Sequence, residues 1–283
     1  MTLPSVAEAT PPPAGDLASL GASRGDRFVH RYELDPSRPQ VTAALRDAAV
    51  RALAPAVLWW VLVAASGLVI VHVLDGFRAE DAVDRWFEHR RTGTFDAVSS
   101  VFSTVGSTPY AIGACVLVAC LVLWRTRQWW FAVVAPLALS LQAIVFASSS
   151  TLVGRSRPDV VKLDDSPPTS SFPSGHTSAS SALYFTVAVI AQRIQHDALR
   201  RTVTVVALLV PFCVATARLY RGMHAPLDVT FGLLNGTVCM VLAWGYLRRD
   251  VRSQQPQGTQ TRSAAGRTDT SRVVDGSMTS PST

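Results

Sequence analysis

The sequence predicts an all-α protein that crosses the membrane as a bundle of six transmembrane helices. One reason is its low charge, since 16% of the 283 residues are Asp, Glu, Lys or Arg, against about 25% in soluble domains. The other is their placement, because the charges gather at the two ends and in a few loops and leave uncharged apolar runs between them. This pattern argues against an ordinary soluble protein and against a disordered one.

Six uncharged runs lie between the terminal segments, and each is expected to form a helix. A helix needs about 20 residues to span the hydrocarbon, and the first, second, third and sixth runs meet or approach that length. The fourth and fifth have 16 residues each, so we expect them to cross with their outer ends low in the membrane. The runs cover residues 52–74, 105–124, 129–149, 177–192, 202–217 and 229–247.

The two terminal segments have a different composition from the runs. Residues 1–45 are rich in Ala, Pro and Ser, and no apolar core of the signal-peptide kind starts near Met1. Residues 250–283 are rich in Ser, Thr, Gln and Gly, with few large apolar groups. We expect both to be disordered cytoplasmic tails around a membrane domain of residues 46–249.

Arginine accounts for nearly all of the positive charge. The formal net charge is +6, and of the 26 basic residues only Lys162 is a lysine. The arginines flank apolar runs and form no basic stripe with interleaved aromatic residues, which favours a membrane protein over a nucleic-acid-binding one. Turning the short arginine-rich loops to the cytoplasm places both termini inside. In a plasma membrane the remaining loops then face outward.

The four cysteines all lie within apolar runs, where packing is their expected role. Neither a disulfide framework nor a zinc site is expected from their positions. They are Cys115, Cys120, Cys213 and Cys239.

The long outer loop of residues 75–104 has apolar residues at helical spacing, among them Val83, Trp86 and Phe87. This spacing is typical of a helix lying at the membrane interface. A loop packed over the bundle fits the same residues equally well.

Three polar segments at the ends of predicted helices carry the residue types of a phosphate-handling site. They are residues 154–158, after the third run, residues 173–176, at the start of the fourth, and residues 218–228, between the fifth and sixth. Charged groups at such positions are costly unless they are paired or functional. The expected topology puts all three segments on the outer face, where they can converge.

Several of these residues are suited to binding an anion. Ser174 and Gly175 open a helix, whose first amide N–H groups lack partners and whose dipole favours a phosphate. Arg157 and Arg218 offer planar guanidinium groups for phosphate oxygens, and Arg155 is a candidate third.

Two histidines and an aspartate are suited to nucleophilic and acid–base chemistry. His224 and Asp228 face the same way if their segment is helical, and a carboxylate beside an imidazole fixes its tautomer and stabilises its cation. His176, on the other side of the anion site, is placed to protonate a leaving oxygen. Each motif alone is more often structural, but the order and shared face of all three favour phosphoryl transfer without a metal.

These segments resemble the three motifs of the type 2 phosphatidic acid phosphatase family, which is related to bacterial acid phosphatases and vanadium haloperoxidases. The family patterns are Lys-x6-Arg-Pro, Pro-Ser-Gly-His and Ser-Arg-x5-His-x3-Asp. The second is complete at residues 173–176, the third matches Arg218, His224 and Asp228, and the first retains Arg157 and its proline. The resemblance extends over about residues 50–248 through the layout of six spans.

The resemblance implies a fold and a mechanism. The fold is an all-helical bundle of the acid phosphatase/haloperoxidase type. By the same resemblance, His224 attacks phosphorus and forms a phosphohistidine, Asp228 orients it, and His176 is the general acid. Arg157, Arg218 and the Ser174–Gly175 segment would hold the phosphoryl oxygens, and no metal or cofactor is expected.

Two positions depart from the family pattern. The lysine of the first motif is replaced by Ser150, and the serine of the third by Ala217. A charge-assisted hydrogen bond is worth about 1.5–3 kcal/mol, so loss of the lysine would slow the reaction about tenfold or more. Arg155 and Lys162 are candidates to supply the missing cation.

The sequence therefore predicts a membrane phosphatase acting on a lipid phosphate or diphosphate. The expected substrates are an isoprenoid phosphate or diphosphate, such as undecaprenyl diphosphate, or a phosphatidic-acid-like lipid. Two alternatives remain, a non-catalytic lipid-phosphate binder or transporter, and a lipid phosphotransferase of the same fold.

Overall fold

The computed structural model describes residues 28–29, 39–74, 78–166 and 168–247, and its regular structure over those residues is helical throughout. Most of the two expected tails lies outside the described residues. The expected boundary at residue 45 falls inside a helix, because α3 already begins at Val41.

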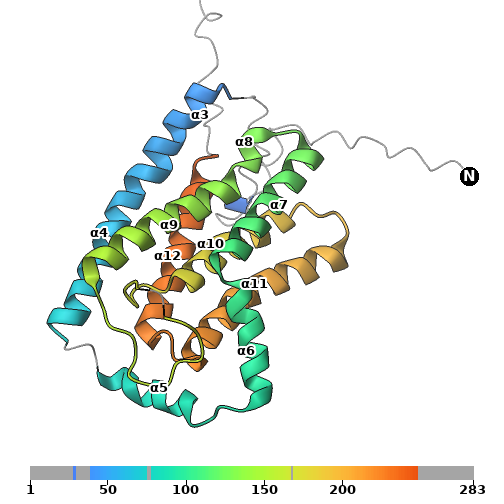
Figure 1. Cartoon of the computed structure of the whole chain (residues 1–283). Helices are drawn as coiled ribbons and strands as arrows, with labels where there is room; N and C mark the ends of the chain where they lie inside the picture. The colour runs from blue at the N-terminus through green and yellow to red at the C-terminus, as the bar shows by residue number, and fades with distance from the viewer. Residues whose placement is uncertain (1–27, 30–38, 75–77, 167, 248–283) are drawn as a thin grey trace, which may run out of the picture. The chain divides into compact units, whose positions relative to one another are not determined.

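The helices run back and forth along the bundle, as Figure 1 shows. The first span combines α3, a π-helical segment η2 and α4. The short elements η3, α5 and α6 follow, and α8 leads directly into α9. The bounds are α3 Val41–Ala48, η2 Ala49–Leu53, α4 Ala54–His72, η3 Arg78–Glu80, α5 Asp81–Glu88, α6 Gly93–Val105, α7 Thr108–Thr126, α8 Trp129–Ala132, α9 Val134–Val153, α10 Gly175–Ala191, α11 Asp197–Tyr220 and α12 Pro226–Gly245.

Five helical segments among the described residues are long and apolar enough to cross a membrane. They correspond to the first, second, third, fifth and sixth predicted spans, which confirms an all-α membrane bundle. The fourth predicted span is α10, which has 17 residues and falls short of that length. The five are Val41–His72, Thr108–Thr126, Trp129–Val153, Asp197–Tyr220 and Pro226–Gly245.

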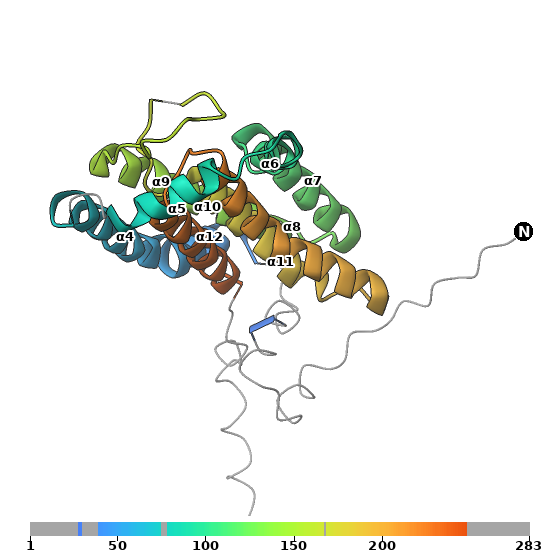
Figure 2. The ribbon, with the colours of Figure 1, turned by 90° about the horizontal axis from the view of Figure 1, so that it is seen from below.

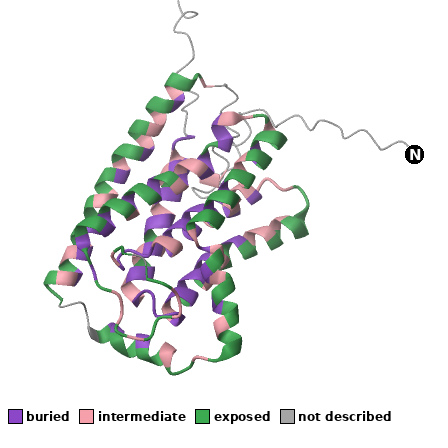
Figure 3. Ribbon diagram, viewed as in Figure 1, coloured by how far each residue is buried: buried purple, intermediate pink, exposed green. Residues whose placement is uncertain are grey.

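Helix α10 forms the centre of the bundle and packs against α9, α11 and α12. Figure 3 shows buried residues gathered along these central helices, while the outer faces of α4, α7 and α11 are exposed. The contact between α10 and α12 is close because small residues meet there. A side chain at Gly236 would come within 2.6 Å of Ser181, Ser178 and Ala182. Small residues at a membrane helix interface allow this approach of two backbones.

The segment between α4 and α7 forms two short helices, α5 and α6, rather than an irregular loop. The helical alternative for this segment is therefore confirmed. Val83 and Trp86 on α5 and Phe95 and Val101 on α6 are exposed. Both helices lie at the end of the bundle to which the loops after α9 and α11 also belong, as Figures 1 and 2 show.

Candidate active site

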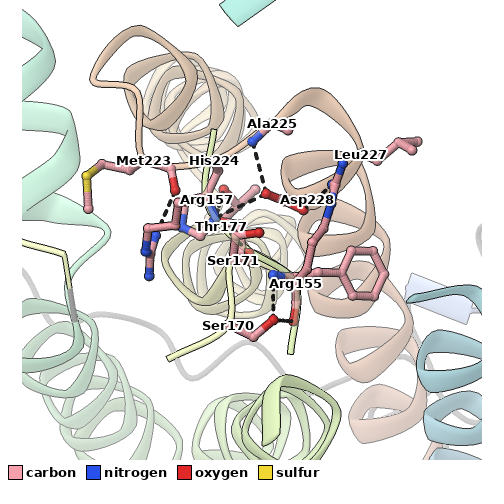
Figure 4. Close-up of polar contacts among 12 residues, drawn as sticks. Arg155, Arg157, Ser170, Ser171, Thr177, Met223, His224, Ala225, Leu227 and Asp228 are labelled. Carbon is pink, nitrogen blue, oxygen red and sulfur yellow. Dashed lines mark hydrogen bonds and ion pairs between the residues drawn. The ribbon is translucent and has the colours of Figure 1, made fainter. Parts of the chain in front are cut away.

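The three polar segments lie at the same end of the bundle. Residues 154–158 follow the C-terminus of α9, residues 173–176 lead into α10, and residues 218–228 join α11 to α12. Direct bonds link them, since the Ser174 amide donates to the Asp228 carbonyl at 2.9 Å and Arg157 Nη1 donates to the Met223 carbonyl at 2.7 Å. The convergence expected from the sequence is therefore present (Figure 4).

The ring of His224 is buried and has a defined orientation. Its Nδ1 lies 2.8 Å from the carbonyl oxygen of Ser171. Because a carbonyl only accepts, Nδ1 carries the hydrogen and Nε2 of the neutral ring has a free lone pair. Ser171 is itself fixed, since its amide donates to the Arg155 carbonyl at 2.9 Å and its hydroxyl to the Ser156 carbonyl at 2.8 Å. Burial lowers the pKa of His224 despite the nearby Asp228, which keeps the ring neutral and nucleophilic.

The carboxylate of Asp228 divides its two oxygens between different partners. Oδ2 accepts the Ala225 amide at 2.9 Å and lies 3.7 Å from Nδ1 of His224. Oδ1 accepts Nη1 of Arg155 at 2.6 Å. Asp228 is fully buried, so these bonds compensate for the loss of water around its charge. The carboxylate lies beside the histidine as expected, but His224 precedes α12, so the contact is not one between two residues of a helix.

Arg155 connects Asp228 to a residue that the sequence analysis did not identify, Glu80. Nη2 of Arg155 lies 2.5 Å from Oε2 of Glu80, and Oε1 of Glu80 accepts the amide of Leu227. Burial disfavours the charge on Arg155, but the two carboxylates outweigh it and raise its pKa. The substrate-binding role expected for Arg155 stays a prediction.

Arg157 lies between the loop that carries His224 and a cavity. Its bond to the Met223 carbonyl fixes the backbone just before the histidine. Burial lowers the pKa of Arg157, and the nearby Asp228 opposes the shift in part. A guanidinium remains charged at neutral pH under such shifts, so Arg157 supplies positive charge close to His224.

Arg218 is buried and belongs to a network that reaches the loop before α10. Its Nη1 donates to Oγ of Ser103 at 2.7 Å and to Oδ2 of Asp164 at 2.8 Å. Arg221 binds the other oxygen of Asp164 at 2.6 Å. Two guanidinium groups share one carboxylate, so the network keeps a net positive charge for an anion. Burial opposes the charge of Asp164, but the two arginines outweigh it and lower its pKa.

The start of α10 supplies backbone donors and the second histidine. The Ser174 amide is bonded to Asp228, and the Ser174 hydroxyl lies 3.0 Å from Oγ1 of Thr177. The amides of Gly175 and His176 lie in the first turn, where a helix provides no carbonyl partner. His176 interacts electrostatically with Arg218, His224 and Arg157.

A cavity of about 370 Å³ lies beside Arg155 and Arg157. Four carboxylate side chains also line it, from Glu80, Asp81, Asp84 and Asp159. Within the described residues, no group of three or more His, Cys, Asp or Glu side chains is arranged to hold a metal ion. All four cysteines are free.

The two positions that depart from the family pattern are both buried. Ser150 is 5% exposed near the end of α9, and Ala217 is 4% exposed before Arg218. Of the two candidate replacements for the lysine, Lys162 is exposed in the loop before α10. The other, Arg155, is bonded to two carboxylates. That either residue supplies the missing cation stays a prediction.

The sequence analysis missed three side chains that hold the site together, Glu80, Asp164 and Ser103. Each is a single polar residue in a segment of mixed composition, and its partner lies more than 50 positions away. Spacing along the chain carries no signal for such pairs. Asp164 lies two residues after Lys162, which was the residue of that loop named as a candidate cation.

Comparisons with known proteins agree with the arrangement. Residues 131–252 match the family model of the PAP2 superfamily. The chain is similar to the first transmembrane PAP2 type phosphatidylglycerolphosphate phosphatase from Bacillus subtilis, with 19% identity and a TM-score of 0.59 over 68% of this chain and 94% of that one. It is also similar to Aquifex aeolicus LpxE, with 23% identity and a TM-score of 0.45 over 57% and 92% of the two chains. No curated protein matches the chain significantly.

The five apolar helical segments define a multi-pass membrane protein, and the converging motifs form one polar site at the end of its bundle. The match over residues 131–252 supports the resemblance to this family over that part of the chain.

Proposed function

We propose that this protein hydrolyses the phosphate or diphosphate of a membrane lipid through a phosphohistidine at His224. The observation that supports this most is the bond from Nδ1 of His224 to the Ser171 carbonyl, at 2.8 Å. That bond leaves Nε2 unprotonated at a site that also contains Arg157, Arg218 and the start of α10. An imidazole nucleophile beside anion-binding groups is the arrangement needed for covalent phosphoryl transfer.

The reaction has two steps. Nε2 of His224 attacks phosphorus, the bond from phosphorus to the leaving oxygen breaks, and His176 donates a proton to that oxygen. Asp228 stabilises the positive ring of the phosphohistidine. Water then attacks phosphorus and gives a proton to His176, the bond from nitrogen to phosphorus breaks, and phosphate leaves. Arg157 and Arg218 stabilise the charge on the phosphoryl oxygens in both steps.

The lipid substrate is supported by the position of the site. Five helical segments of the bundle can cross a membrane, and the site lies at their common end, where a lipid headgroup is within reach. We propose α10 as a sixth crossing, since its 17 residues extend about 25 Å at the centre of the bundle. A site near the end of so short a helix lies at headgroup depth. Isoprenoid phosphates or diphosphates and phosphatidic-acid-like lipids have the expected chemistry.

The distribution of arginine supports an outward-facing site in the plasma membrane. The end of the bundle opposite the site has seven arginines and two acidic residues among its described residues. Such loops stay in the cytoplasm by the positive-inside rule. The arginines are Arg46, Arg51, Arg125, Arg127, Arg193, Arg200 and Arg201, and the acidic residues are Asp47 and Asp197.

The test is phosphate release by the purified protein in detergent with a chelator present. The panel holds polyprenyl diphosphate, polyprenyl phosphate and phosphatidic acid. We expect release from at least one lipid, a loss of about 1,000-fold or more in His224→Gln because the nucleophile is gone, and no loss in Arg200→Met. Arg200 pairs with Asp197 at the other end of α11, at 2.6 Å, so it controls for loss of an arginine.

A second measurement identifies the intermediate. Quenching the reaction in alkali, where phosphohistidine survives, should leave a phosphoryl group on the peptide that contains His224. Release that persists in His224→Gln would contradict the proposed nucleophile. Binding of a lipid phosphate without release would favour a non-catalytic binder, and release that requires an added alcohol acceptor would favour a phosphotransferase.

A further inference from the structure

The side chains of Glu80, Arg155 and Asp228 form a closed buried unit behind His224. Arg155 donates to Asp228 at 2.6 Å and to Glu80 at 2.5 Å through its two terminal nitrogens. Glu80 uses its second oxygen to accept the amide of Leu227, which precedes Asp228 in the first turn of α12. The three side chains are 0% to 8% exposed. The unit thus joins the segment before α5, the loop after α9 and the start of α12.

We propose that Arg155 and Glu80 are positioning residues that hold Asp228 beside His224, and that neither contacts the phosphoryl group. This proposal rests on the proposed function of the site. It assigns Glu80, which belongs to none of the three motifs, a part in the reaction. It also assigns Arg155 to binding Asp228 and not to binding the substrate.

The geometry explains what the clamp does to Asp228. Bonding of Oδ1 to Arg155 and of Oδ2 to the Ala225 amide prevents the carboxylate from rotating. The oxygen left facing the histidine is Oδ2, at 3.7 Å from Nδ1. Without Arg155 the carboxylate would lose its only charge-assisted donor among the contacts described here. A carboxylate held at both oxygens keeps its orientation better than one held by a single amide.

The charges of the unit explain why Glu80 is needed as well. Glu80, Arg155 and Asp228 carry one positive and two negative charges, which sum to −1. When His224 becomes positively charged as the phosphohistidine forms, the sum becomes zero. Replacing Glu80 with a neutral residue would leave the histidine cation without that compensation in a buried site. Removing Arg155 would leave two buried carboxylates unpaired, and one of them would take up a proton.

The two carboxylates beside Arg155 argue against a phosphate contact. Both of its terminal nitrogens are bonded to carboxylates within 2.6 Å. The negative charge of these carboxylates would repel a phosphate at the same guanidinium. Arg157, which is bonded to a single backbone carbonyl at 2.7 Å, has donors left for a phosphoryl oxygen. The two arginines, two positions apart, therefore have different roles.

The experiment compares turnover with phosphate binding in matched variants. The lipid that the wild type hydrolyses is the substrate, p-nitrophenyl phosphate is a second substrate, and inorganic phosphate is the competing ligand. We expect Arg155→Met to lower kcat about 100-fold or more and Glu80→Gln about tenfold, with KM and the inhibition constant of phosphate changing less than about threefold. Arg157→Met should instead raise the inhibition constant about tenfold or more.

Two further variants separate positioning from folding. Arg155→Lys keeps the charge but not the two-pronged geometry, so it should recover about a tenth of the wild-type kcat. In the Arg155→Met background, Glu80→Gln should have little further effect, because one of the two unpaired carboxylates is already protonated there. Arg200→Met should retain wild-type kcat. Thermal unfolding of each variant in detergent checks that it is folded.

The outcomes distinguish the clamp from the proposed function. A wild type that hydrolyses neither a lipid nor the aryl phosphate would overturn both proposals. An active wild type with unchanged kcat in folded Arg155→Met would overturn the clamp alone. A tenfold rise in the phosphate inhibition constant in Arg155→Met would also overturn it, since Arg155 would then bind phosphate directly.

Discussion

At the scale of the residue, the charges at this site form two groups in which positive and negative side chains are unequal in number. Asp164 is shared by two arginines, whereas Arg155 is shared by two carboxylates. The first group favours an anion, and the second favours a histidine cation. A phosphatase that forms a phosphohistidine needs both kinds of group close to the histidine. The side chain of Asp84 adds a third carboxyl near the second group.

The buried carboxyl of Asp84 should make the stability of the protein depend on pH. It is 3% exposed, and burial, together with the charges of Glu80 and Asp228, raises its pKa from 3.8 to about 7. The folded state therefore binds a proton that the unfolded state releases, and stability falls as the pH rises from about 4 to 7. Asp84→Asn cannot ionise, so it should raise the apparent melting temperature at pH 8 by about 4 °C or more and raise it less at pH 5.

The control for Asp84 lies on the same short helix. Asp81 is exposed, so Asp81→Asn should change the melting temperature little at either pH. The measurement is thermal unfolding in detergent at pH 5 and pH 8. An equal effect of Asp84→Asn at both values would show that Asp84 does not titrate in this range.

At the scale of the element, the interface of α10 and α12 sets the geometry of the site. Ser174 at the start of α10 is bonded to Asp228 on α12, and the same two helices meet again two turns further on at Gly236. The close approach brings His176 and Asp228 into one layer. Helix α10 is short and lined with Ser, Thr and Ala, which suits a central position between neighbours better than contact with lipid.

A side chain at Gly236 should disturb both stability and activity. In Gly236→Ala the new methyl group would lie 2.4 Å from Cβ of Ser181 and 2.5 Å from the Ser178 carbonyl oxygen. Because these are a backbone atom and a Cβ, α10 has to move. We expect a cost of about 1–3 kcal/mol, a lower apparent melting temperature and a reduced kcat.

Helix α7 offers a matched control for this substitution. A methyl group at Gly113 would meet nothing within 4 Å. Gly113→Ala should therefore be neutral or stabilise the protein by about 0.5–1 kcal/mol through helix propensity. The measurement is the apparent melting temperature of both variants and their phosphate release. Equal stability of the two variants would show that α10 and α12 tolerate a wider spacing.

At the scale of the whole molecule, the two ends of the bundle differ in charge and in contents. The site end has the paired carboxylates and arginines described above. The opposite end has short arginine-rich turns between α7 and α8 and between α10 and α11. This asymmetry underlies the proposed outward orientation of the site.

The orientation predicts which cysteine substitutions a membrane-impermeant maleimide will reach in intact cells. Lys162→Cys lies in an exposed position of the site end, and Arg201→Cys in an exposed position of the other end. We expect labelling of Lys162→Cys without permeabilisation and of Arg201→Cys only after it. The unsubstituted protein controls for its native cysteines. The reverse pattern would place the site on the cytoplasmic face.

Local patterns in the sequence were sufficient for the helices and for much of the site. Apolar runs between charged residues have a clear cause, since hydrocarbon excludes charge, and they located the spans, although the first helical segment begins at Val41 rather than at residue 52. The proximity of His224 and Asp228 was expected from helical spacing, but His224 precedes α12, so the turn before that helix brings the two together. The two short helices α5 and α6 were one of two alternatives, because their apolar spacing suits an exposed helix and a packed loop alike.

The sequence by itself determined an all-α membrane bundle and the residues that meet at one end of it. Only the tertiary structure decided how these residues are paired. Arg155 and Arg157 were both expected to bind phosphate. In the structure Arg155 is bonded to Asp228 and to Glu80, which lies 75 positions before it. The bond from His224 to the Ser171 carbonyl likewise joins residues 53 positions apart. Such partners are fixed by the packing of α9, α10 and α12, whose contacts are non-local and have no period in the sequence.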